Sequence, residues 1–64
     1  MKTKDFDKIT KDFIKDLFES ENKIQMQSLK TAIRNFILFN ILDSKQLKAM
    51  LYLNSEVYIK INRL

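Results

Sequence analysis

None of the 64 residues is glycine or proline. Tight two-residue hairpins and left-handed helix C-caps normally use glycine, and proline interrupts many loops. A chain that has neither residue is therefore expected to make few sharp turns. Long helices joined by short polar segments satisfy this restriction best. The expected fold class is all-α, a single small domain of three or four helices over residues 1–64.

The residue inventory also excludes many kinds of chemistry. The chain has no Cys and no His, so zinc fingers, disulfides and triads that need a His or Cys are ruled out. The absence of Gly rules out the loops that cradle phosphates in nucleotide-binding proteins. Acidic pairs such as Asp12 and Asp16 lie among lysines rather than in an apolar pocket. We therefore expect a protein that is not an enzyme and has no catalytic residue, metal, cofactor or small-molecule substrate.

The chain shows no sign of a membrane segment or a targeting segment. No apolar run approaches the roughly 20 residues that are needed to cross a bilayer. Residues 1–7 are rich in Lys and Asp and lack the apolar stretch of a signal peptide. We expect a cytoplasmic protein with no membrane partner.

The first predicted helix covers residues 4–20. Its apolar residues Phe6, Ile9, Phe13 and Leu17 recur at helical spacing, while charged side chains occupy the other face. Thr3 or Asp5 is predicted to cap its start. The polar segment 20–23 that follows is predicted to be the first joint.

The second predicted helix covers residues 24–42, and its end is more apolar than one buried stripe requires. Six of the seven residues from Phe36 to Leu42 are apolar. Two short neighbouring helices cannot cover so many apolar side chains. We therefore expect Phe36, Leu38 and Phe39 to form an interface, either in a homodimer or with a protein partner.

The third predicted helix covers residues 44–53. Asp43 and Gln46 have the spacing of a capping box at its start, and Asn54-Ser55 is predicted to end it. Residues 56–62 allow two interpretations. Their apolar spacing favours a fourth helix, whereas their β-branched residues, alternating with polar ones, would suit a β-strand.

The basic residues are concentrated in the later part of the chain. Residues 22–64 carry seven Lys and Arg against Asp43 and Glu56, whereas residues 1–21 carry five Lys against six acids. Within the basic part, residues 44–63 resemble the helix-turn-helix unit of bacterial and phage repressors. The apolar positions that carry the resemblance are Leu47, Leu51, Leu53, Tyr58 and Ile61.

The resemblance implies a recognition helix that meets the major groove of DNA. The side chains that the resemblance and the local charge assign to nucleic acid are Lys45, Lys48, Asn54, Ser55, Lys60 and Arg63. The first hypothesis is therefore a small DNA-binding or transcription-regulating protein. The alternative is a non-enzymatic adaptor or inhibitor of a phage or mobile element, which binds a protein such as a nucleic-acid enzyme.

Overall fold

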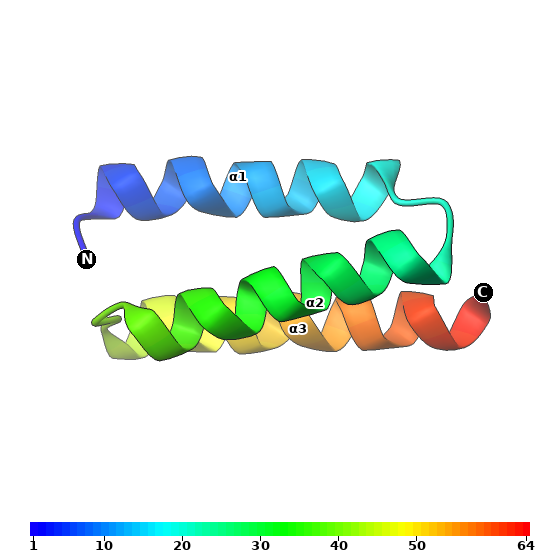
Figure 1. The fold of residues 1–64 in the computed structure, drawn as a ribbon. Coiled ribbons are helices and arrows are strands. Elements are labelled where there is room, and N and C mark those ends of the chain that lie inside the picture. Colours follow the sequence, from blue (N-terminus) through cyan, green and yellow to red (C-terminus); the bar gives the residue numbers. More distant parts are fainter.

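A computed structural model describes all 64 residues and contains three α-helices and no strand. The helices are α1 (Thr3–Glu19), α2 (Lys23–Phe39) and α3 (Ser44–Arg63). Each helix is antiparallel to the one before it, and all three lie along the length of an elongated bundle of 33 × 16 × 16 Å (Figure 1). The predicted all-α fold is confirmed.

The joints show how the chain turns without glycine. No residue has a positive φ, and the residues that flank the helices are in extended conformations. At the first joint the Asn22 side chain accepts a hydrogen bond from the Gln25 amide at 2.9 Å. At the second joint the Asn40 side-chain amide donates to the Phe36 carbonyl at 2.9 Å. Asparagine side chains thus satisfy backbone groups at both joints.

Two of the expected helix ends are wrong. The N-cap position of α1 is Lys2, which makes no side-chain capping hydrogen bond, whereas Thr3 and Asp5 already lie inside the first turn. The α2 helix ends at Phe39 rather than at residue 42. The apolar residues Ile41 and Leu42, which were predicted to extend the helix, belong to the joint instead, and of these two only Leu42 is half-buried.

The start of α3 is the predicted capping box, and it also holds the N-terminus. The Asp43 carboxylate accepts from the Gln46 amide at 2.8 Å, and the Gln46 side chain accepts from the Asp43 amide at 3.1 Å. The Gln46 side chain also donates to the Met1 carbonyl at 2.9 Å. Gln46 is the only buried polar residue. Its carboxamide therefore joins the N-terminus to the start of α3, although Met1 and Gln46 are 45 positions apart in the sequence.

Residues 44–63 form one uninterrupted helix, which corrects the predicted end at residue 53 and the strand alternative for residues 56–62. The buried residues Met50, Leu53 and Val57 recur every three or four positions across Asn54-Ser55. Burial along this stripe outweighs the weak helix preference of Asn and Ser, which costs less than about 1 kcal/mol per residue. Residues 44–63 consequently do not form two helices joined by a turn.

The core lies mainly between α2 and α3. Six of the seven buried apolar residues come from these two helices, and α1 contributes only Phe6. The half-buried Phe13 and Leu17 of α1 pack against the same cluster. The Phe36 ring lies 6.4 Å from the Phe6 ring and 5.7 Å from the Phe13 ring. Aromatic packing thus attaches α1 to the α2–α3 pair.

Candidate functional site in the groove between α2 and α3

The structure disperses the residues that were assigned to nucleic acid. Lys45 and Arg63 stand at opposite ends of α3, about 27 Å apart along the helix axis. The Lys60 ammonium donates a hydrogen bond to the Leu17 carbonyl of α1. These cations therefore do not form one compact patch.

The other residues assigned to nucleic acid, Lys48, Asn54 and Ser55, differ in how exposed they are. Lys48 and Ser55 are exposed on α3. Asn54 is half-buried, and its side-chain oxygen is fully buried with no hydrogen-bond partner. Because the helix continues through these positions, Asn54 and Ser55 do not lie at the start of a recognition helix.

The three predicted interface residues are divided between the core and the surface. Phe36 is half-buried and packs its ring against α1. Leu38 and Phe39 are 65% and 82% exposed, and Ile41 beside them is 90% exposed. The structure thus retains an exposed apolar end of α2, but without Phe36.

A shallow groove runs between α2 and α3, and no residue of α1 lines it. It consists of two adjoining hollows that share Lys30, Arg34 and Tyr58. We call it the α2–α3 groove and define it by eleven residues: Gln27, Lys30, Thr31, Arg34, Ile37, Leu38, Leu51, Asn54, Tyr58, Ile61 and Asn62.

One end of the groove is more apolar than the other. Leu38 and Leu51 line one end together with Ile37, whereas Gln27 and Asn62 line the other. On each helix the residues that line the groove recur about three or four positions apart, as residues on one face of a helix do. From position 27 to position 38 of α2 the groove is about 16 Å long, the length of roughly three helical turns.

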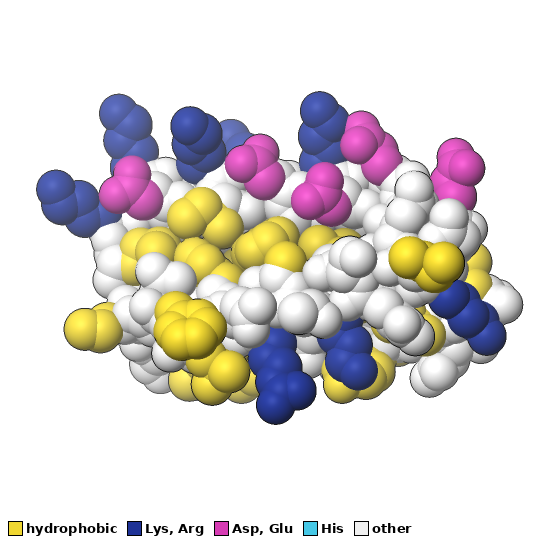
Figure 2. Space-filling model, viewed as in Figure 1, with side chains coloured by type: hydrophobic (Ala, Val, Ile, Leu, Met, Phe, Trp, Pro, Cys, Tyr) yellow, Lys and Arg dark blue, Asp and Glu magenta, His cyan; other side chains and the backbone are white.

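The charged residues of the groove are all cationic. The Lys30 ammonium lies 4.4 Å from the centre of the Tyr58 ring, in a cation–π contact. Arg34 is exposed one helical turn further along α2. No carboxylate lines either hollow. Figure 2 shows one face of the molecule, on which acidic side chains lie among lysines along α1 and the first joint and none lies over the lower helices.

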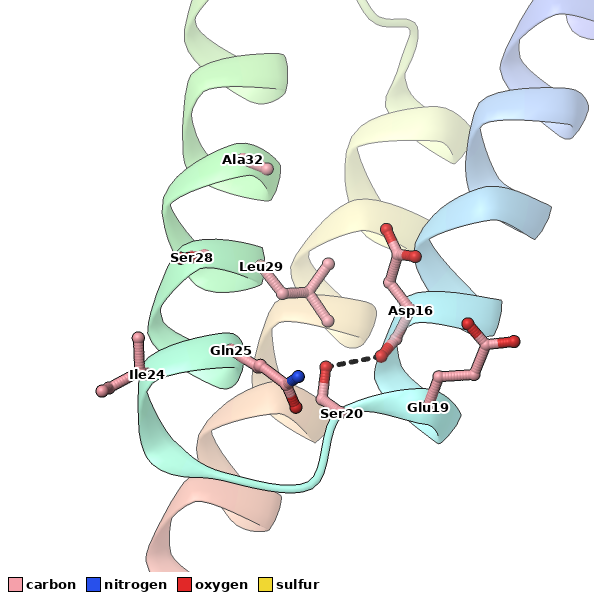
Figure 3. Close-up of a pocket in the computed structure, with 8 residues that line it drawn as sticks. All are labelled: Asp16, Glu19, Ser20, Ile24, Gln25, Ser28, Leu29 and Ala32. Carbon is pink, nitrogen blue, oxygen red and sulfur yellow. Dashed lines mark hydrogen bonds between the residues drawn. The ribbon is translucent and has the colours of Figure 1, made fainter.

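Two other hollows are less suited to a ligand. The first, of about 500 Å³, lies between α1 and α2 beside the short side chains of Ser28 and Ala32. Its acids are Asp16 and Glu19; the Glu19 carboxylate points away from Leu29 (Figure 3), and no third acid joins them. This hollow is best explained as a packing gap above small residues.

The second lies where α1 meets the end of α3. Phe18 and Ile59 are exposed there, but Glu56 stands beside Lys60 and Arg63. Its charges are therefore mixed, and Lys60 is already bonded to α1.

Leu51 and Tyr58, two of the apolar positions that carry the helix-turn-helix resemblance, are not buried in the core. They are 52% and 44% exposed. The signal that identifies them is the phase of α3. Once Met50, Leu53 and Val57 are taken as the buried stripe, Leu51 and Tyr58 fall on its flank, facing the edge of α2.

Comparisons with protein-family models, curated proteins and solved structures found no match. None of the three helices combines the length and apolar character that spanning a bilayer requires. The fold is that of a small three-helix bundle.

Proposed function

We propose that this chain is a non-enzymatic adaptor that binds a protein partner through the α2–α3 groove. The observation that carries the proposal is the composition of the groove, which places exposed Leu38, Leu51 and Tyr58 beside Lys30 and Arg34. Apolar and aromatic side chains with an adjacent Arg are typical of the centre of protein interfaces. The phosphate backbone of a nucleic acid is polar and charged, so exposed leucine side chains make few favourable contacts with it.

DNA binding is the second candidate, because α2 and α3 together carry seven Lys and Arg against one acid, Glu56. In this case the phosphates would contact lysines along the bundle without a recognition helix. Such binding would be weakly sequence-specific and steeply dependent on salt.

One experiment separates the two candidates. Phage-displayed random 16-residue peptides are selected on the wild-type protein and on the Leu51→Ser/Tyr58→Ser variant, after circular dichroism confirms that the variant is folded. Adaptor function predicts clones that bind the wild type at least tenfold more tightly than the variant. In parallel, a labelled 20-base-pair duplex is titrated at two salt concentrations.

The absence of groove-dependent clones would overturn the adaptor proposal. If the duplex also binds with a steep salt dependence, DNA binding replaces adaptor function as the proposed function. Lys45→Ala and Lys48→Ala should then each reduce the salt slope by about one charge, while Arg34→Ala alone would not abolish binding.

A further inference from the structure

We infer that the segment that docks in the α2–α3 groove is an acidic amphipathic helix of the protein partner, an inference that rests on the proposed function. The shape of the groove suits a helix. The groove is the seam between two antiparallel helices and is about three helical turns long. A third helix laid along such a seam places one side chain per turn into it, at positions i, i+3 or i+4 and i+7.

The charge of the groove favours an acidic helix. Lys30 is half-buried and its ammonium is held over the Tyr58 ring, and Arg34 follows one turn later on the same helix. Neither shares the groove with a carboxylate. A docking helix with Asp or Glu on its flanks would provide the missing counter-charges as it excludes water. A neutral or basic helix would leave both cations partly desolvated and unpaired.

The polarity of the groove also sets the register of the docking helix. Leu38, Leu51 and Ile37 surround the apolar end, so a large aliphatic or aromatic anchor fits there. The carboxylates belong one to two turns away, opposite Arg34 and Lys30. Polar residues suit the end lined by Gln27 and Asn62.

The test uses a displayed library of 16-residue helical peptides. Apolar residues are fixed at i, i+4, i+7 and i+11, and every other position is Glu or Lys in equal proportion. Selection on the wild-type protein should enrich Glu over Lys at least threefold at the positions that flank the apolar stripe. Selection on Arg34→Glu, which changes an exposed side chain, should remove or reverse that bias.

The matched control is Lys11→Glu, which makes the same change of charge on the exposed face of α1 and should keep the Glu bias. Individual Glu-rich clones should bind Arg34→Glu about tenfold more weakly than Lys11→Glu. The variant Lys30→Gln removes the second cation without introducing a charge and should weaken the same clones.

The remaining outcomes distinguish the two proposals. A Glu-to-Lys ratio equal to that of the unselected pool, or an enrichment of Lys, overturns the acidic helix. If groove-dependent clones nevertheless emerge from the random library, the adaptor proposal stands without it. If neither library gives groove-dependent clones, both proposals fail.

Discussion

The ammonium of Lys60 on α3 donates a hydrogen bond to the backbone carbonyl of Leu17 in the last turn of α1. Helix α1 has no basic residue of its own in that turn. Its terminal carbonyls lack intrahelical donors and carry the negative end of the helix dipole. A cation supplied by α3 therefore stabilises the end of α1 and fixes it against the rest of the bundle.

Replacing Lys60 with Met should lower the free energy of unfolding by about 1 kcal/mol, because Met retains most of the aliphatic stem but cannot donate to Leu17. Chemical denaturation measures the loss. Hydrogen exchange should show that the amides of α1 near Leu17 exchange faster while those of α3 keep their protection. Lys45→Met is the control, since Lys45 is exposed and should leave the stability within about 0.5 kcal/mol. Equal stability of both variants would contradict the anchoring role.

Gln46→Ala should be the most damaging polar-to-alanine change, lowering the free energy of unfolding by about 2–3 kcal/mol. The buried carboxamide satisfies the Asp43 amide and the Met1 carbonyl, and its removal leaves both without those bonds. Gln25 offers a matched control, because its side chain also accepts from a preceding amide, that of Glu21, but is exposed to water. Gln25→Ala should cost less than about 1 kcal/mol. Similar losses for the two variants in urea titrations would show that Gln46 has no special role.

How much of this structure the sequence predicts depends on whether the deciding contacts are local. Asp43 and Gln46 are three residues apart, and their capping box was predicted because it needs no tertiary information. The end of the third helix was misplaced because Asn54-Ser55 is a local signal, whereas the stripe that overrides it acts through packing against α2.

The groove was not predicted, because it also depends on tertiary packing. Lys30 and Tyr58 meet only because α2 and α3 pack antiparallel in one register, which their separate apolar patterns do not define. The sequence therefore identified the exposed apolar end at Leu38 and Phe39 and the excess of basic residues, but not the surface that combines apolar and basic side chains.

Glu56→Pro tests the continuity of α3. In an unbroken helix proline removes the amide that bonds the carbonyl four residues earlier and clashes with it, at a cost of about 3 kcal/mol or more. Were a second helix to begin after Ser55, proline at position 56 would occupy its first turn and be tolerated. We therefore expect Glu56→Pro to abolish the cooperative thermal transition followed by circular dichroism.

The control is Ser44→Pro, at the true first position of α3, where Asp43 is already extended as a following proline requires. It should melt within a few degrees of the wild type. A folded Glu56→Pro variant would restore the two-helix layout of residues 44–63.

Asn54→Ala should increase the stability, unlike most substitutions at half-buried positions. The Asn54 side-chain oxygen is buried without a hydrogen-bond partner, so its removal relieves a desolvation cost of about 1 kcal/mol and also improves helix preference. Asn35→Ala is the control, because Asn35 is exposed on α2 and its replacement should give only the gain in helix preference, of about 0.5 kcal/mol. Thermal melts of both variants measure the difference. A net destabilisation by Asn54→Ala would mean that this amide stabilises the α2–α3 contact.

Phe39→Glu tests whether the exposed end of α2 mediates self-association. Leu38, Phe39 and Ile41 leave a cluster of large apolar side chains in water, and a second copy of the chain is one partner that would cover it. In sedimentation equilibrium at micromolar concentrations the wild type should include a dimer, and the variant should shift to a 7.7 kDa monomer with an unchanged circular dichroism spectrum. Ile24→Glu is the control, because Ile24 is 79% exposed at the opposite end of α2 and should leave the association intact. A wild type that stays monomeric at high concentration would show that this end of α2 does not bind a second copy.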